Sequence, residues 1–406
     1  MKYVVLVPDG AADRPLEERG GLTPLEAART PNMDFIAREG ICGTAVTVPE
    51  GMPAGSDVAN YSLLGYDPRE FYGGRGPLEA ASMGIELEPE QVAFRCNLVT
   101  EKEGVLADYS AGHITTRESR ELIHALSERL DDAFTAFHPG VGYRHILLLK
   151  GLKHLEDRCH PPHDVVGREM EGILPEGPGA SRLNALMRLS RRILSEHPVN
   201  KRREAQGLPT ANLIWPWGQG RTPTLPTLQE KYGLRGAIIT AVDLLKGLGK
   251  LAGLEVVDVP GATGYYDTDY SAKAAYASEC LRRLDLVYIH VEAPDEAGHE
   301  GNWQEKVTAI ERVDELILGS LLDETVRSGE EFAFLLVPDH PTPLKVRTHV
   351  PDPVPFAVYF PNAVPDACKA FSEKAAEEGS FREYAAWHLM EMLMDKAGGI
   401  RAASRM

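Results

Sequence analysis

Cysteine and basic charge are both scarce in this sequence of 406 residues. The chain has five cysteines and no CxxC pair, which excludes a disulfide-stabilised scaffold and indicates a reducing compartment. The chain has 43 basic and 60 acidic residues, which gives a net charge of −17. This sign disfavours binding to a nucleic-acid backbone or an anionic membrane surface. We interpret most of the acidity as charge that keeps the protein in solution.

Long apolar runs are also missing. No stretch approaches the roughly 18 apolar residues that a membrane helix needs. The apolar run at 3–7 is too short for the core of a signal peptide and is followed at once by Pro8 and Asp9. Apolar residues make up 43% of the chain and charged residues 25%, which is the balance of a folded, water-soluble protein. We therefore expect a cytoplasmic protein and leave its oligomeric state open.

Three short apolar runs are each followed by an acidic residue: 3–7 by Asp9, 286–291 by Asp295, and 332–337 by Asp339. Such runs, separated by helical patterns, are typical of buried strands in a parallel sheet. In these sheets ligands collect beyond the carboxyl ends of the strands. The sequence therefore predicts an α/β fold, with a mostly parallel sheet flanked by helices and one site shared by the three aspartates.

The pattern changes in the middle of the chain. Strands at 93–99 and 145–150 and a helix at 116–131 predict a smaller α+β unit with its own layers. We therefore expect two domains: residues 1–75 with 216–406, which carry the aspartates, and an inserted domain at 76–215. An amphipathic pattern at 381–396 predicts a helix near the end of the chain.

Histidines accompany two of the strand-end aspartates. Asp295 and His299 are four residues apart, Asp339 and His340 are adjacent, and His349 follows. Carboxylate and imidazole together are ligands for zinc, manganese and similar divalent ions. Each pair alone is more often structural. Their shared position at strand ends, together with Asp9, predicts six ligands for two ions.

Ser56 is a second candidate for chemistry. It follows the Gly- and Pro-rich segment GMPAG and precedes a helical pattern at 58–64. A helix N-terminus stabilises anionic groups and offers free N–H groups to phosphate. On local sequence alone, a purely structural role of Ser56 or Asp57 as an N-cap is favoured. As a nucleophile Ser56 would need activation by metal, because its motif contains no histidine to act as a base.

These motifs resemble a known family. The order of Asp9, Ser56, Asp295 with His299, Asp339 with His340, and His349 is similar to the metal-binding signature of the alkaline phosphatase superfamily. The chain as a whole resembles the archaeal-type cofactor-independent phosphoglycerate mutases, through LVPDG, TPLEAARTPNMD, PAGSDVAN, GRGPLEAASMG, PGATGYYDT, DEAGHEGN and PDHPTP. The resemblance implies an alkaline-phosphatase-like fold with the smaller domain inserted.

The same resemblance implies roles for individual residues. One ion would be held by Asp295, His299 and His349, and a second by Asp9, Asp339 and His340 with Ser56 beside it. Ser56 would carry the phosphoryl group between the two hydroxyls of phosphoglycerate, without 2,3-bisphosphoglycerate. We expect Mn²⁺, with Zn²⁺, Mg²⁺ and Co²⁺ as alternatives. The inserted domain would close over this small phosphorylated substrate. The candidate substrate contacts are Arg75, His113, Arg144, Asp164 and Lys231.

Some residues depart from the expected mutase pattern, among them Val58-Ala59-Asn60, Pro341 and the segment IWPW at 214–217. These features also resemble a bacterial branch proposed to act as homoserine kinase, with ATP as the phosphate donor. A metal-dependent phosphomonoesterase is a further alternative. A metal-binding regulatory protein without activity is disfavoured because all six ligands and Ser56 are present.

Overall fold

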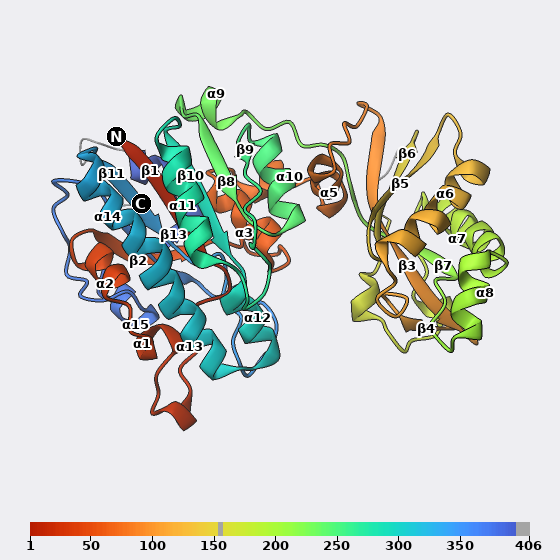
Figure 1. The fold of residues 1–406 in the computed structure, drawn as a ribbon, viewed down its shortest axis with the longest axis horizontal. Helices are drawn as coiled ribbons and strands as arrows, with labels where there is room; N and C mark the ends of the chain where they lie inside the picture. Colours follow the sequence, from red (N-terminus) through yellow and green to blue (C-terminus); the bar gives the residue numbers. More distant parts are fainter. Residues whose placement is uncertain (153–156, 395–406) are drawn as a thin grey trace. The chain divides into compact units, whose positions relative to one another are not determined.

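A computed structural model describes residues 1–152 and 157–394 of the chain. The chain divides into two compact units, which Figure 1 shows in sequence colours. Unit 1 comprises residues 1–72 and 225–406, and unit 2 comprises residues 73–224. Strand β7 (Leu213–Gly220) belongs to unit 2 because it pairs with β3 (Gln91–Lys102). The boundary expected after residue 215 would have cut this strand.

Unit 1 is built on an eight-stranded, mostly parallel sheet. In spatial order its strands are β13 (Phe381–Ala385), β2 (Ile41–Val46), β12 (Val354–Tyr359), β11 (Phe332–Leu336), β1 (Lys2–Pro8), β10 (Leu286–Val291), β8 (Gly236–Ile239) and β9 (Glu255–Val256). Only the β2–β12 and β12–β11 pairs are antiparallel. The predicted α/β class and the three predicted central strands are therefore confirmed.

The central strands bring the three aspartates together. Strand β1 pairs in parallel with β10 on one side and with β11 on the other. Because these strands run in the same direction, their carboxyl ends lie side by side. Asp9, Asp295 and Asp339 follow those ends and converge on one edge of the sheet.

Helices cover both faces of this sheet. Their bounds in unit 1 are α1 (Pro24–Ala27), α2 (Pro31–Arg38), α3 (Ser56–Leu63), α4 (Pro68–Phe71), α9 (Leu228–Tyr232), α10 (Asp243–Leu251), α11 (Tyr270–Leu281), α12 (Ala293–Glu300), α13 (Trp303–Arg312), the π-helix η4 (Val313–Gly319), α14 (Ser320–Ser328), α15 (Glu373–Ala376) and α16 (Leu389–Met394).

Successive side chains of a strand point to opposite faces of the sheet, so their contacts show which helix lies on which face. Val287 of β10 joins a core formed with α2, α11 and the α13–η4–α14 run, and these helices pass in front of the sheet in Figure 1. Tyr288, the next residue, points to the opposite face and donates a hydrogen bond to Asn60 of α3. Helix α3 therefore lies on that opposite face, with its first residue, Ser56, at the edge where the aspartates converge.

Unit 2 is an α+β unit, as its sequence pattern predicts. Its antiparallel strands are β3, β4 (Val105–Asp108), β5 (Thr135–Val141), β6 (Arg144–Lys150) and β7. Its helices are α5 (Arg75–Ser82), α6 (Thr116–Leu130), α7 (Ala180–Ser195) and α8 (Pro198–Ala205). An apolar core of its own joins the sheet to α6 and α7.

The predicted helix at 381–396 is wrong over its first half. Phe381 pairs with Gly43 of β2, so this segment adds an edge strand to the sheet. Phe381 and Tyr384 also pack against Phe356. The helix α16 begins at Leu389, and residues 395 and 396 lie outside the described part of the chain.

Across the described residues, no helix combines the length and the apolar character needed to cross a membrane.

Candidate metal centre

The first group of predicted ligands lies buried after β1 and β11. We call Asp9, Asp339 and His340 the Asp339 cluster. Their donor atoms lie within 4.8 Å of one another, and none of the three residues is more than 2% exposed. His340 Nε2 is 3.6 Å from Asp9 Oδ1 and 3.5 Å from Asp339 Oδ2. The three side chains therefore face a common point.

Burial and neighbouring charges set the protonation of this cluster. Burial and the nearby Asp339 raise the pKa of Asp9 well above its usual value. Burial opposes ionisation of Asp339 too, but His340 and His290 lower the pKa of Asp339 below its usual value. Burial lowers the pKa of His340, so its ring is neutral at pH 7. A neutral imidazole beside an ionised carboxylate is a form that binds a cation.

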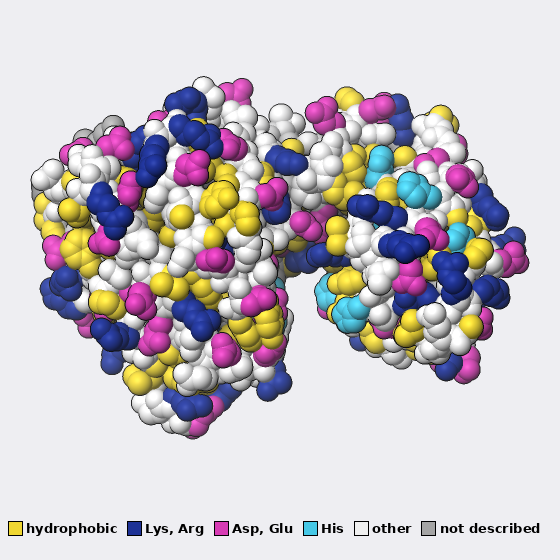
Figure 2. Space-filling model, viewed as in Figure 1, with side chains coloured by type: hydrophobic (Ala, Val, Ile, Leu, Met, Phe, Trp, Pro, Cys, Tyr) yellow, Lys and Arg dark blue, Asp and Glu magenta, His cyan; other side chains and the backbone are white. Residues whose placement is uncertain are grey.

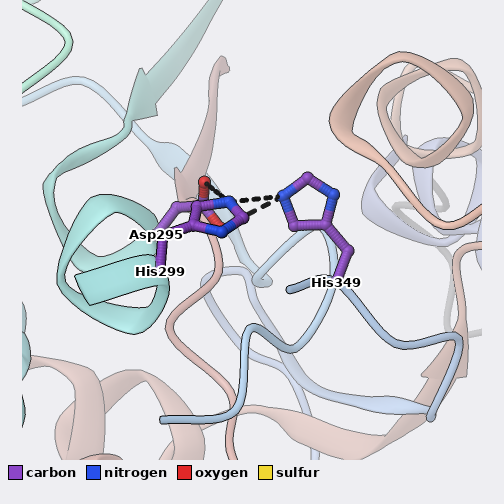
Figure 3. A group of neighbouring side chains, drawn as sticks. All are labelled: Asp295, His299 and His349. Atoms are coloured by element: carbon purple, nitrogen blue, oxygen red, sulfur yellow. Dashed lines mark hydrogen bonds and ion pairs between the residues drawn. The ribbon is translucent and has the colours of Figure 1, made fainter. Parts of the chain in front are cut away.

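The second group lies beside it and is drawn in Figure 3. We call Asp295, His299 and His349 the Asp295 cluster. His299 Nε2 lies 2.9 Å from His349 Nε2 and 3.2 Å from Asp295 Oδ2. These spacings match ligand atoms that share an ion at about 2.1 Å each. Nδ1 of His299 lies 3.1 Å from the Arg347 carbonyl oxygen. A proton on Nδ1 donated to this carbonyl leaves Nε2 free to bind.

Charge pairing dominates the Asp295 cluster. Burial opposes ionisation of Asp295, but hydrogen bonds from His299 and His349 hold its pKa well below the usual value. The Asp295 carboxylate in turn raises the pKa of His299 to about 9. In the absence of an ion, both ring nitrogens of His299 are therefore protonated at pH 7, and the ring is positively charged.

Gly10 allows the two clusters to meet. Its φ of +60° is in the left-handed region, and a Cβ at this position would lie 2.5 Å from Asp295 Oδ1. Its backbone N–H donates to Asp339 Oδ1 at 3.2 Å. The glycine of LVPDG is thus required because the chain passes between the two aspartates.

Helix α3 presents Ser56 to the Asp339 cluster. Ser56 Oγ lies 3.1 Å from His340 Nε2. Asn60, one turn further along the helix, donates to the Ser56 carbonyl at 2.8 Å and to Asp339 Oδ2 at 3.0 Å. Asn60 is one of the residues that depart from the expected mutase pattern, and its side chain links α3 to the Asp339 cluster. The free N–H groups of the helix N-terminus lie beside Ser56 and favour an anion there.

His290 is a member of this site that the sequence analysis missed. It is fully buried in β10, on the face where α3 lies, and its Nε2 is 3.2 Å from Asp9 Oδ2. The available signal was a polar residue near the end of an otherwise apolar strand. That signal is weak because a buried histidine is commonly structural.

Asp9 Oδ1 and His290 Nδ1 are buried polar atoms with no hydrogen-bond partner among the described residues. Leaving Asp9 Oδ1 unpaired costs free energy, and a bound cation would satisfy this oxygen. Mixed carboxylate and imidazole donors suit divalent transition ions. The residues present therefore fit divalent cations at both clusters.

Three of the predicted substrate contacts lie in unit 2 near Trp217, Arg95 or His163. The guanidinium of Arg75 lies 5.8 Å from the Trp217 ring. Burial, together with Arg75 and Arg144, lowers the pKa of the neighbouring Arg95, so the three cations are close. Asp164 is beside His163, whose ring is 5.4 Å from Trp217. Histidine, lysine and arginine side chains also mingle on the visible face of unit 2 in Figure 2.

The other two predicted contacts differ from these. His113 is exposed, in a turn that Ser110 holds by accepting from the His113 N–H. Lys231 of unit 1 donates instead to the carbonyl of Gly65, beyond the C-terminal end of α3, and stands 5.2 Å from the Tyr66 ring. Because Ser56 begins that helix, the structure does not bring Lys231 to the metal clusters.

Comparison with known proteins gives a consistent result. A family model described as 2,3-bisphosphoglycerate-independent phosphoglycerate mutase matches residues 37–200. A protein of that name from Methanothrix thermoacetophila is 53% identical, over 94% of this chain and 96% of the relative. A second such protein, from Methanothermobacter thermautotrophicus, is 50% identical, with 99% of each chain covered.

Solved structures agree over nearly the whole length. A protein from Pyrococcus horikoshii has a TM-score of 0.81 at 30% identity, covering 97% of this chain and 96% of that one. A cofactor-independent phosphoglycerate mutase from Thermoplasma acidophilum has a TM-score of 0.67 at 30% identity, covering 97% and 99%.

Proposed function

Because this chain belongs to the 2,3-bisphosphoglycerate-independent phosphoglycerate mutase family, we propose that it is an isomerase that interconverts 3-phosphoglycerate and 2-phosphoglycerate, a step of glycolysis and gluconeogenesis. The observation that carries the proposal is the placement of Ser56. Its hydroxyl lies at a helix N-terminus, 3.1 Å from a ring nitrogen of His340. Two carboxylate–imidazole clusters flank the same edge of the sheet.

In this proposal the two clusters hold divalent ions, with Mn²⁺ as the first choice. The Asp295 cluster would hold one ion, and the Asp339 cluster a second, with Ser56 beside it. Such ions, when bound, neutralise phosphoryl oxygens and lower the pKa of a serine hydroxyl. The unpaired buried oxygen Oδ1 of Asp9 supports this assignment.

Ser56 would act as the nucleophile of a two-step transfer. Its Oγ attacks the phosphorus of the substrate, the bond from phosphorus to the substrate oxygen breaks, and that oxygen takes up a proton. The second hydroxyl of the retained glycerate then attacks the phosphorus of phosphoserine and loses its proton, the bond from phosphorus to Ser56 Oγ breaks, and Ser56 Oγ takes up a proton. Asn60 donates to the Ser56 carbonyl and to Asp339 Oδ2, and so holds the first turn of α3 next to the Asp339 cluster. No 2,3-bisphosphoglycerate is needed, because both phosphoryl transfers use the same serine.

The substrate carries a phosphate and a carboxylate, so it needs cations besides the ions. We propose that Arg75 and Arg144 of unit 2, which lie close to Arg95, supply these cations. Glu79 pairs with Arg95 at 2.9 Å and orients it. Site residues of this kind suit a small anionic substrate and do not require nucleic acid or a membrane. All five cysteines are free thiols, which agrees with the cytoplasmic location that we propose.

A two-substrate assay tests the activity. With 3-phosphoglycerate and a divalent ion but no 2,3-bisphosphoglycerate, we expect 2-phosphoglycerate to form, detected by coupling to enolase. The named relatives do not favour homoserine kinase or a phosphomonoesterase. Turnover seen only with ATP and homoserine would contradict the mutase proposal. Release of free phosphate without transfer would indicate a phosphomonoesterase instead.

The pKa of His299 predicts that ion binding depends on pH. Because the Asp295 carboxylate raises this pKa to about 9, an ion must displace a proton from His299 at neutral pH. We expect the affinity for Mn²⁺ to rise about tenfold per pH unit from pH 7 toward 9. Without an ion, the His299–Asp295 pair stabilises the fold fully below about pH 6.5, and that stabilisation is lost as the pH rises through about 9. Calorimetric titrations at several pH values measure the affinity, and a constant affinity would contradict the prediction.

A further inference from the structure

Thr342 lies between the two clusters and has been given no role so far. Its side chain is fully buried. The hydroxyl donates a hydrogen bond to Asp295 Oδ1, and its oxygen also lies 3.3 Å from His340 Nδ1. One hydroxyl group therefore touches a predicted ligand of each ion.

The direction of these bonds follows from the number of protons. A hydroxyl has one proton, and an ionised carboxylate can only accept. Because the Thr342 proton goes to Asp295, the Thr342 oxygen must accept from His340 Nδ1–H. His340 then carries its proton on Nδ1, and Nε2 keeps a lone pair. That nitrogen is the atom that faces Ser56 Oγ at 3.1 Å.

The Thr342 residue is itself held firmly. Lys306, also fully buried, donates to the Thr342 carbonyl at 2.8 Å and to Asp13 Oδ2 at 2.8 Å. The Thr342 N–H donates to the Ala12 carbonyl at 3.3 Å. On the other side, a Cβ placed on Gly298 would lie 2.8 Å from Thr342 Cγ2. The hydroxyl therefore has little freedom to turn away from Asp295 and His340.

We propose that Thr342 is a positioning residue that couples the two metal clusters, by orienting the Asp295 carboxylate and fixing the tautomer of His340. This inference rests on the proposed function only in requiring that both clusters bind divalent ions. The interaction is of the kind that orients metal ligands through their outer hydrogen bonds, where loss of one partner commonly weakens binding about 10- to 100-fold.

Ion binding without substrate tests the proposal. Mn²⁺ is titrated calorimetrically into wild-type protein, T342V and T342S, with Zn²⁺ in a parallel series. Valine keeps the shape and removes the hydroxyl, and we expect both sites of T342V to bind about 10- to 100-fold more weakly. Serine keeps the hydroxyl, and T342S is expected to recover most of that affinity.

The matched control is T100V, the same substitution in unit 2. The hydroxyl of Thr100 is buried and donates to the Thr210 carbonyl at 2.8 Å, so T100V also loses one buried hydrogen bond. Its ion affinities are expected to equal those of wild type. Wild-type affinity of T342V at both sites, or a loss confined to one site, would overturn the proposal. Failure of the wild-type protein to bind either ion would instead overturn the proposed two-ion function.

A second measurement is made on the wild-type protein itself. Long-range ¹H–¹⁵N NMR of histidine-labelled wild-type protein, prepared free of added ions, reports which ring nitrogen of His340 is protonated. We expect the proton on Nδ1, with the resonance assigned by its absence from H340Q. A proton on Nε2 would overturn the proposed role of Thr342.

Discussion

Replacing Ser56 by alanine is expected to reduce mutase turnover by at least about 10³-fold. The substitution removes the oxygen that would carry the phosphoryl group, while the helix N-terminus and the clusters around it stay in place. Ser56 is half-buried and makes its side-chain contact with His340, so its loss costs the fold little. The measurement is the enolase-coupled rate, together with the trapping of labelled phosphoserine from radioactive substrate, which we expect in wild type and not in S56A.

The same helix offers a matched control for this experiment. Ser62 is fully buried in α3, and its hydroxyl donates to the Thr47 carbonyl at 2.7 Å. S62A is expected to lose about 1 kcal/mol of unfolding free energy and to keep its turnover. If S56A turns over as S62A does, Ser56 is not the nucleophile.

Removing divalent ions with a chelator is expected to abolish turnover and to lower the melting temperature by several degrees. The clusters bury three aspartates, and Asp9 Oδ1 has no hydrogen-bond partner among the described residues, so an ion offsets an electrostatic cost in the folded state. An ion at 100 times its Kd stabilises a folded protein by about 2.7 kcal/mol, and two such ions by about twice that. Metal analysis of the purified protein, melting curves and restoration of turnover by Mn²⁺ check this expectation. Full activity in a protein shown to be free of metal would contradict it.

A pair of variants separates the effect on the ions from the effect on the fold. D339N removes a buried negative charge that accepts from Gly10, Asn60 and the His340 N–H, and we expect Mn²⁺ to stop raising its melting temperature. D314N is the control, because Asp314 is equally buried but caps α2 by accepting from the Met33 N–H at 2.7 Å. D314N is expected to be less stable than wild type and still to gain stability from Mn²⁺. An equal gain in D339N would mean that Asp339 is not a ligand.

Position along the sequence was sufficient to predict the convergence of the aspartates. Asp9, Asp295 and Asp339 each follow an apolar strand, and parallel strands bring their carboxyl ends to one edge of the sheet. The roles of the six ligands came from the resemblance to a family. The structure brings their side chains together in the two groups that the resemblance implies, and their assignment as ligands stays a proposal.

Other site residues carry no local signal. His290 and Thr342 act through contacts with residues tens or hundreds of positions away, such as Asp9 and Asp295. A histidine in a strand, or a threonine after a proline, has the same sequence pattern whether or not such a contact forms. The sequence likewise gives no signal that the ammonium group of Lys231 donates to the carbonyl of Gly65.

The edge strand β13 shows tertiary structure overriding a local pattern. The apolar spacing at 381–396 is compatible with a helix, but β2 offers an unpaired edge and Phe356 an apolar surface. The pairing of Phe381 with Gly43 gives the edge of β2 a hydrogen-bonded neighbour, and the Phe381 ring packs against Phe356. The amphipathic pattern thus continues as a helix only from Leu389.

By itself the sequence determined the α/β class, the central strands and the candidate ligands at their ends, because periodicity and residue type are local properties. The tertiary structure decided which buried groups face the two clusters, and that one threonine hydroxyl touches both. These features depend on distances between segments nearly 300 residues apart, and only the packing of α3, β1, β10 and β11 sets those distances.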